Sequence, residues 1–375
     1  MSSQDLLHTL ALTRISHLNL TTALELYRRL GSGAAIYEHR NDIADILPNC
    51  SPKLVSALRD WSEPLHRAEV EMDYCQLNNI SILCLGEPPY PERLTECPDA
   101  PIVLFYKGNA DLNQKKVLSI VGTRRSTKYG ADVIHRFVSD LKALCPKVLV
   151  VSGLAYGIDI LAHREALACG LETVAVLAHG LDNLYPTAHR ATANEMVSHG
   201  GLLTEYMTGT NADKPNFIRR NRIVAGVSDA CILVESSARG GGLITARISQ
   251  SYYRDVFAVP GRIGDEHSEG CNNLIRDNGA TLLSSAEHFA KAMGWDDEPL
   301  RNEALTRGIE RQFFPDLTPE QTLLADQLKK LGDLPTTVLS TKTGLPIHKV
   351  NSLLFELEMA GVVKPLAGGV YHILS

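Results

Sequence analysis

The stretch Val117-Leu-Ser-Ile-Val-Gly122 sets the fold class of this chain, because a short apolar run ends directly in a glycine. Behind that glycine, apolar residues recur at the spacing of one helical face. They are Ile134, Phe137, Val138, Leu141 and Leu144. This order predicts a buried strand, a tight turn and an amphipathic helix.

The same order recurs between residues 116 and 285. Val148-Leu-Val-Val151 leads into Gly153 and Gly157, and helical spacing follows. Further strand-like runs lie at 173–177, 202–203, 231–234, 256–259 and 281–283. Continuous apolar strands that alternate with amphipathic helices are typical of a parallel sheet covered on both faces. We therefore predict an α/β fold whose ligands bind beyond the carboxyl ends of the strands.

Two smaller regions flank this sheet. The first has short helical patterns, and its turn at 15–20 lacks the glycine with which helix-hairpin-helix modules bind phosphate, so we do not expect DNA binding there. The last has a helix cap at Thr318, a helix-turn-helix pattern around Gly344 and a wing-like hairpin at 362–371. The predicted division is a small helical domain of the SAM or helix-hairpin-helix type at 1–67, an α/β domain at 68–290, a charged linker at 291–313 and a winged-helix-like domain at 314–375.

Overall composition restricts the class of protein. The chain has 375 residues and a formal net charge of −6, so it offers no broad basic surface to duplex DNA. Its eight cysteines form no CxxC pair, which is typical of a reducing compartment. The sequence shows neither a signal-peptide pattern nor an apolar run of membrane-spanning length. We expect a cytoplasmic protein without a membrane partner, in which any nucleic-acid site is a focused pocket.

One local stretch contrasts with this acidic total. Between residues 213 and 222, the cations Lys214, Arg219, Arg220 and Arg222 surround Phe217. Guanidinium groups pair with phosphates, and an aromatic ring stacks on an unpaired base. The alternative is a solvated helix face with ion pairs. Because acidic residues are absent from 214 to 222, we favour single-stranded nucleic acid and expect this stretch to form a loop at the sheet edge.

Three glycine-containing turns are expected beside it, at 121–130, 152–159 and 239–246. In each, backbone N–H groups at the start of the next helix can accept an anion. Arg124, Arg125 or Lys128 adds charge to the first turn. In the second, Asp159 either caps the helix or binds a sugar or base.

The usual signatures of catalysis are missing. The first turn lacks the second and third glycines of GxGxxG, and the chain contains no GxxxxGK[ST], HExxH or GxSxG motif. His163, His179 and His189 have no zinc spacing and are interpreted as structural hydrogen bonders. We predict no catalytic residue, no metal and no cofactor.

Taken together, the motifs resemble those of the DNA-processing protein A family, DprA or Smf. The likeness rests on an ordered set of short motifs in the central region. They are Tyr90-Pro-Glu-Arg-Leu94, Val121-Gly-Thr-Arg124, Ser152-Gly-Leu-Ala-Tyr-Gly-Ile-Asp159 with His163, Gly180-Leu-Asp182 with Tyr185-Pro186, Phe217 with Arg220-Asn-Arg222, Val259-Pro-Gly261, and Gly270-Cys-Asn272 with Leu274-Ile275.

The resemblance implies a non-enzymatic protein of natural transformation that binds and protects incoming single-stranded DNA and helps to load the recombinase RecA. It also implies an extended Rossmann-like core that forms a homodimer, a small helical N-terminal domain and a C-terminal winged helix. The DNA-binding residues that it implies are Gly122, Thr123, Arg124, Gly153, Gly157, Lys214, Phe217, Arg220, Asn221, Arg222, Gly241 and Thr245. The family usually has Ser-Gly-Ser where this chain has Gly240-Gly-Gly242, so a hydroxyl contact is not expected there.

Two alternatives stay open. Phosphoribohydrolase-like enzymes also place a glycine turn before a Thr-led helix, as in Gly240-Gly-Gly-Leu-Ile-Thr245, but their glutamate is absent from the residues that follow. The winged-helix region has few basic residues, chiefly Lys342, His348 and Lys349, so it could bind duplex DNA, a regulator or a partner subunit.

Overall fold

The computed structural model describes residues 2–47, 50–296, 317–359, 362–366 and 369–373. It divides into two compact units, residues 1–283 and 284–375, which are treated separately below. In the described part of the chain, no helix is both long enough and apolar enough to cross a lipid bilayer.

The first unit is built on a sheet that has nine strands in the described residues, in the order β1-β2-β6-β5-β4-β3-β7-β8-β9. The strands are β1 Ser81–Cys84, β2 Val103–Gly108, β3 Val117–Val121, β4 Leu149–Ser152, β5 Thr173–Val176, β6 Gly200–Thr204, β7 Ala230–Leu233, β8 Asp255–Ala258 and β9 Thr281–Leu282. From β6 through β9 all neighbours are parallel, whereas β2 runs antiparallel to β6 and β1. The predicted parallel sheet is confirmed, and the proline-containing segment before it supplies β1 and β2.

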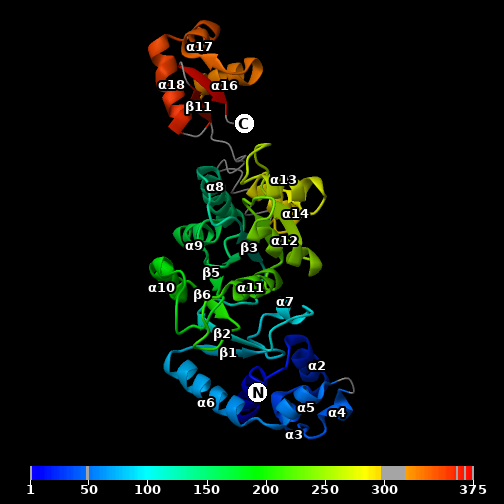
Figure 1. Ribbon diagram of the computed structural model, residues 1–375. Coiled ribbons are helices and arrows are strands. Elements are labelled where there is room, and N and C mark those ends of the chain that lie inside the picture. Colours follow the sequence, from blue (N-terminus) through cyan, green and yellow to red (C-terminus); the bar gives the residue numbers. More distant parts are fainter. Residues whose placement is uncertain (1, 48–49, 297–316, 360–361, 367–368, 374–375) are drawn as a thin grey trace. The chain divides into compact units, whose positions relative to one another are not determined.

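Helices cover both faces of this sheet. Those of the sheet region are α7 Glu92–Thr95, α8 Lys128–Leu144, α9 Ile158–Ala168, the 3-10 helix η1 Thr187–His189, α10 Arg190–Ser198, α11 Lys214–Gly226, α12 Gly241–Ser251 and α13 Glu269–Arg276. Helices α8, α9 and α10 lie on one face, and α11 and α12 pack side by side on the other (Figure 1).

The first strand and helix form as their sequence predicts. Every residue of β3 is buried, because both faces of the sheet are covered. Helix α8 begins at the Thr127 cap, whose hydroxyl accepts from Gly130 N, and its apolar face, including Ile134, Phe137 and Leu141, is buried. The tight turn between the two elements is therefore held from both sides.

The order of strands reverses at β3. From β3 the chain proceeds to β4, β5 and β6 on one side, and then crosses to β7, β8 and β9 on the other. The loops after β3 and β7 diverge at such a point and leave a crevice at the carboxyl edge. This edge is where the predicted glycine turns lie.

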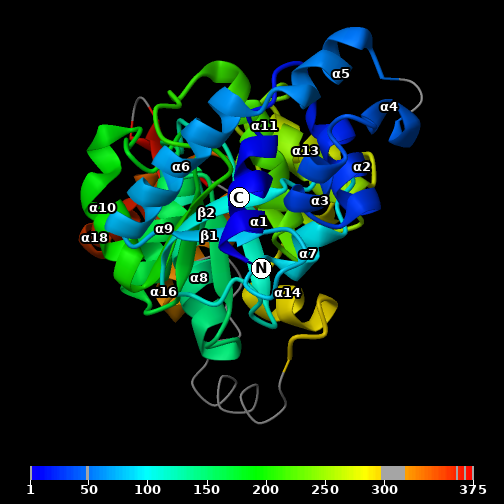
Figure 2. The same cartoon turned by 90° about the horizontal axis from the view of Figure 1, so that it is seen from below.

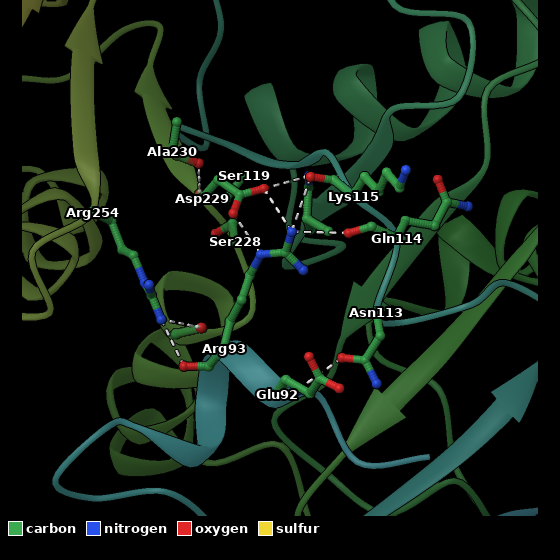
Figure 3. Close-up of polar contacts among 12 residues, drawn as sticks. Glu92, Arg93, Asn113, Gln114, Lys115, Ser119, Ser228, Asp229, Ala230 and Arg254 are labelled. Carbon is green, nitrogen blue, oxygen red and sulfur yellow. Dashed lines mark hydrogen bonds and ion pairs between the residues drawn. The ribbon is translucent and has the colours of Figure 1, made fainter. Parts of the chain in front are cut away.

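The opposite edge of β3 and β7 is fixed by Arg93 on α7 (Figure 3). Its guanidinium makes a two-pronged ion pair with Asp229, at 2.5 and 3.0 Å, and also donates to Gln114 O. The Asp229 carboxylate accepts from Val117 N at 2.8 Å, which joins the beginnings of the two strands. Arg254 donates in turn to Arg93 O at 2.6 Å. The Tyr90–Leu94 motif thus holds the sheet together at the edge away from the glycine turns.

The N-terminal helices share a core with the sheet. They are α1 Ser3–Leu12, α2 Leu20–Leu30, α3 Gly33–Glu38, α4 Ile43–Ile46, α5 Pro52–Arg59 and α6 Ser62–Leu77. Their buried residues form one continuous apolar cluster with those of β1 and β2, and α6 lies along the β1 edge (Figure 1, Figure 2). A division at residue 67 would fall within α6, and the predicted domain limits stay predictions.

The second unit contains the predicted helix-turn-helix and hairpin. Its elements are α14 Ala286–Ala292, α16 Pro319–Leu331, β10 Leu334–Pro335, α17 Thr336–Thr343, α18 Ile347–Met359, β11 Val363–Leu366 and β12 Val370–Ile373. The predicted cap at Thr318 and the predicted turn at Gly344 are confirmed. Thr318 caps α16 together with Gln321, and Gly344 ends α17 in the left-handed conformation. Leu324, Leu339 and Leu354 belong to a separate small core. Of the predicted linker, 297–313 lies outside the described residues, as do 314–316, 360–361 and 367–368.

Candidate nucleic-acid interface

A cavity of about 570 Å³ opens at the carboxyl ends of β3, β4 and β7. This volume is within the range of ordinary ligand pockets. Its lining residues are Val121, Gly122, Thr123, Arg124, Gly153, Ala155, Asp159, Ala212, Lys214, Phe217, Ile218, Arg220, Asn221, Val224, Gly240, Gly241, Gly242, Ile244 and Thr245. The structure thus brings together ten of the twelve predicted site residues, leaving out Gly157 and Arg222.

The first turn is held in place by the buried Glu235, which follows β7. Thr123 N donates to Glu235 O at 2.8 Å, and Thr127 N donates to the Glu235 carboxylate at 2.9 Å. These bonds fix the backbone from Gly122 to the start of α8. Arg124, in the middle of the turn, is exposed and free to meet a ligand at the rim.

Gly157 supports this turn from behind. Its φ of +76° favours glycine, and an added Cβ would lie 2.2 Å from Thr123 O. Ile158 N also donates to Thr123 O at 3.1 Å. Gly157 therefore shapes the cavity wall without lining the cavity.

Arg220 lines the cavity from a buried position. Only 4% of it is exposed, and its guanidinium donates to Gly153 O at 2.6 Å and to Val176 O. A Cβ on Gly153 would lie 2.2 Å from that guanidinium, so glycine is required there by the close approach of the arginine. Arg220 thereby links the ends of β4 and β5 to α11.

Asp159 lies beside this buried arginine. Helix α9 has Gly157 at its N-cap and no side-chain cap, so the capping role considered for Asp159 is wrong. Burial raises the pKa of the Asp159 carboxyl, while the Arg220 charge and the backbone amide of Ala155 oppose that rise. Asp159 is thus a buried carboxyl that is influenced by the Arg220 charge and also lines the cavity.

The cationic stretch forms helix α11, so the predicted loop is wrong in conformation. Asp213 occupies the N-cap, and Pro215 in the first turn has the fixed φ that suits a helix start. Lys214 is exposed, and Phe217 lies one turn further along and is half-buried. The Arg124 guanidinium carbon is 5.0 Å from the centre of the Phe217 ring, within the range of a cation–π contact.

Arg222 has an acidic partner that local sequence does not reveal. Its guanidinium pairs with Glu205 at 2.6 Å, and Asp99 lies 3.8 Å away. It is buried and lies outside the cavity lining. Burial raises the pKa of the Glu205 carboxyl, and the Arg222 charge counteracts that rise.

Several lining residues were missed by sequence reasoning, among them Ile218, Val224 and Ile244. The signal that could have identified two of them is helical spacing. Lys214, Phe217, Ile218, Asn221 and Val224 stand at positions i, i+3, i+4, i+7 and i+10, which is one face of a helix. A prediction of helix for this stretch would have placed this face toward the ligand.

The glycine turn before α12 forms the remaining wall. Helix α12 begins at Gly241 with Gly240 as its N-cap, and no described side chain caps it. A Cβ on Gly241 would meet no atom within 4 Å, so this backbone faces open space. Its first turn presents N–H groups and the positive end of the helix dipole to the cavity.

The loop that leads into α11 is hydrogen-bonded to helix α6. The buried Glu71 carboxylate accepts from Thr208 N at 2.9 Å, and Arg67 donates to both Glu71 and Thr208 O at 2.8 Å. Gly209 N donates to Asp182 at 3.0 Å. These contacts fix the approach to Lys214 from the N-terminal helices.

The three histidines are hydrogen-bonded within the protein, as predicted. His163 bonds to Thr173 Oγ1 at 2.7 Å, His179 to Gly180 O at 2.8 Å and His189 to Leu154 O at 2.9 Å. In the described part of the chain, no group of three or more His, Cys, Asp or Glu residues is arranged to hold a metal ion.

Burial of His163 makes stability depend on pH. Burial, with smaller contributions from Arg220 and His189, lowers the pKa of His163 from 6.5 to about 3. Below pH 6.5 the unfolded chain binds a proton at His163, whereas the folded chain does not. The contribution of His163 to stability is therefore complete above that pH and decreases as the solution is acidified. We expect the free energy of unfolding to drop by about 2 kcal/mol between about pH 7.5 and about pH 5 from this group alone.

Urea unfolding of the whole chain at the two pH values measures this drop. In His163→Gln the drop should shrink by that amount, whereas His66→Gln, which removes an exposed imidazole, serves as the control. Equal pH dependence in the parent chain and His163→Gln would contradict the assignment.

Residues 81–294 match the family model described as DNA recombination-mediator protein A, and residues 315–369 match the DprA winged helix domain. The chain is 38% identical over 246 residues to DNA processing protein DprA of Streptococcus pneumoniae, which covers 66% of this chain and 84% of that one. It is 32% identical over 334 residues to protein Smf of Escherichia coli, covering 88% and 87%.

Solved structures of DprA proteins agree with this family assignment. The X-ray structure of DprA from Streptococcus pneumoniae has a TM-score of 0.64 and 33% identity, covering 75% of this chain and 95% of that one. A structure of DprA from Helicobacter pylori, described for its single-stranded DNA binding mode, has a TM-score of 0.52 and 28% identity, covering 57% and 95%. The Rossmann-like core and the C-terminal winged helix are therefore those of a known family.

Proposed function

Because the chain belongs to the DNA recombination-mediator protein A family, also called DprA or Smf, we propose that its cavity binds single-stranded DNA. One observation carries the proposal. Lys214 and Arg124 line the same cavity as the partly exposed ring of Phe217, and the Arg124 guanidinium carbon lies 5.0 Å from the centre of that ring. Cations beside an aromatic ring suit a phosphate backbone with unpaired bases.

The two cations have different tasks. The Lys214 ammonium supplies a point charge, and the Arg124 fork pairs with two phosphate oxygens. A base stacks on Phe217, whose ring already packs against the Arg124 guanidinium. The exposed backbone at Gly241 receives a further phosphate at the start of α12.

The predicted site residues divide into two groups. Those proposed to contact DNA are Gly122, Thr123, Arg124, Lys214, Phe217, Asn221, Gly241 and Thr245. Gly153, Gly157, Arg220 and Arg222 instead hold the walls, because their partners lie within the protein. The Helicobacter pylori relative, whose structure is described for its single-stranded DNA binding mode, supports single-stranded DNA as the ligand.

The proposed role is a binding role without catalysis. By family membership we propose that the protein acts in the cytoplasm as a homodimer, protects incoming single strands during natural transformation and promotes loading of RecA. Each bound phosphate releases counterions, so affinity must fall with salt. This expectation distinguishes charge-driven binding from binding by apolar contact.

A titration with fluorescent oligo-dT and with a duplex of equal length tests the proposal. We expect the single strand to bind more tightly, and the logarithm of its binding constant to fall against log salt with a slope of about −0.7 for each phosphate contacted. A duplex that binds equally well, or a binding constant that is indifferent to salt, would count against a single-strand site.

The phosphoribohydrolase-like alternative remains testable because Asp159 faces the cavity. The residues after Thr245 supply no glutamate, so Asp159 is the carboxylate to examine. Release of free base from a nucleoside monophosphate, lost in Asp159→Asn, would favour the enzyme. The proposed binding role predicts no release.

A further inference from the structure

Two exposed tyrosines flank the cavity on the side of β4 and β5. Tyr156 lies in the turn after β4, next to the lining residue Ala155, and 47% of it is exposed. Tyr185 lies in the loop after β5, and 46% of it is exposed. Its ring meets the Phe217 ring edge to face, with centres 5.8 Å apart. Each tyrosine thus adjoins a residue of the cavity but stands outside it.

Both rings are held in fixed positions. Tyr156 packs edge to face on His189, with ring centres 4.9 Å apart, and His189 donates to Leu154 O at 2.9 Å. Tyr185 N donates to His179 Nε2 at 3.1 Å, and His179 donates to Gly180 O at 2.8 Å. Two buried histidines therefore orient the two loops, and an oriented ring loses little entropy when a base stacks on it.

Two exposed arginines lie on α9 and α10, and the second directly follows the His189 on which Tyr156 packs. Arg190, which begins α10 directly after His189, is exposed. Arg164 on α9 is also exposed, and its Nε donates to Thr192 Oγ1 in the first turn of α10 at 3.4 Å. In the described residues neither arginine lies within 4.0 Å of a carboxylate. Exposed guanidinium groups and exposed aromatic rings are together the combination that binds a single strand.

We propose that Tyr185 and Tyr156 form a second base-stacking subsite, onto which a single strand continues after it leaves the cavity past Phe217. This inference rests on the proposed function and assigns the direction of the strand, toward β5 and α10. Bases stack on the two tyrosines, while Arg164 and Arg190 meet the intervening phosphates. Because every base has a flat face, the subsite tolerates any sequence.

Strand length separates this subsite from the cavity. Oligo-dT of about 4 nucleotides fills the cavity, and oligo-dT of about 16 nucleotides also reaches the tyrosines. In Tyr185→Ala/Tyr156→Ala we expect the affinity for the longer strand to fall about tenfold or more, with the shorter strand affected little. The Tyr185→Phe/Tyr156→Phe variant should bind both strands as the parent chain does. Tyr253→Ala, which removes a 96% exposed tyrosine just before β8, is the control.

Missing bases test whether stacking is responsible. A long strand whose bases are removed at one end should bind the parent chain more weakly, and the alanine double variant should show no such loss at that end. Tyr156→Ala alone checks the result independently, because Tyr156 packs on His189 and not on Phe217.

Three results would overturn the subsite. They are parent-like binding of the long strand by the double variant, an equal loss on both strand lengths, or a loss in the phenylalanine variant. Failure of the parent chain to bind either strand would instead overturn the proposed function, and the subsite with it.

Discussion

Replacing Lys214 by alanine is expected to weaken binding of an oligo-dT strand by about tenfold to a hundredfold, since a charge-assisted contact contributes about 1.5–3 kcal/mol. Lys214 is exposed at the mouth of the cavity, and within the described residues it has no carboxylate partner within 4.0 Å. Its loss removes one phosphate contact and leaves no buried group unsatisfied. Folding should therefore be unchanged, with the same unfolding midpoint in urea.

Arg124→Ala should weaken binding at least as much, because the side chain also packs against Phe217. In both variants the salt dependence should become shallower by about 0.7 for the missing phosphate contact. Lys53→Ala is the matched control, since Lys53 is exposed on α5 among the N-terminal helices. If both cavity variants keep the parent affinity and salt slope, the cavity is not the DNA site.

Arg220→Met is expected to destabilise the protein by about 1–3 kcal/mol, the usual cost of leaving a buried hydrogen-bonding group without its partner. The guanidinium satisfies Gly153 O and Val176 O, and its charge compensates the buried Asp159. Methionine fills similar volume but leaves two carbonyls and a carboxylate without that partner. Urea unfolding measures the loss, and DNA affinity should fall as well because the cavity floor moves.

A double-mutant cycle identifies the cause. If the uncompensated Asp159 carboxylate dominates, Asp159→Asn should cost less free energy in the Arg220→Met background than in the parent chain. Additive effects would show that Arg220 acts only through the two carbonyls. Parent-like stability of Arg220→Met would refute the structural role given to this arginine.

These two predictions distinguish a residue that contacts DNA from a residue that stabilises the cavity wall, within one cationic stretch. Lys214 variants should lose affinity and keep stability, whereas Arg220 variants should lose stability first. A sequence reading treats the four cations of this stretch alike. Measurements of both DNA affinity and stability are needed to distinguish the exposed cations from the buried ones.

Sequence periodicity was sufficient for most elements of the fold, with α11 as an exception. The run 117–121 and the helical face from Ile134 to Leu144 are local patterns, and so are the helix-turn-helix around Gly344 and the cap at Thr318. Such patterns depend on neighbours a few residues away, so they can be read from the chain. The meeting of three glycine turns also followed, because parallel strands place their carboxyl ends at one edge.

The sequence predicted most residues of the candidate site but not their geometry. The stretch from Lys214 was expected as a loop and is the helix α11, because its Asp213 cap and Pro215 favour a helix start that the charge pattern concealed. Ile218 and Val224 were missed for the same reason.

By itself, the sequence determined an α/β core with a winged helix and a focused cationic site, since these follow from local spacing and composition. Only the tertiary structure decided that Lys214 and Arg124 face the cavity while Arg220 and Arg222 are buried. The reason is that Arg220 bonds to Val176 O and Arg222 pairs with Glu205. These partners come from strands that are distant from α11 in the sequence, so they reach the arginines only once the sheet has formed. The sequence specifies which side chains are charged. The groups that pair with those charges depend on contacts between segments that lie far apart along the chain.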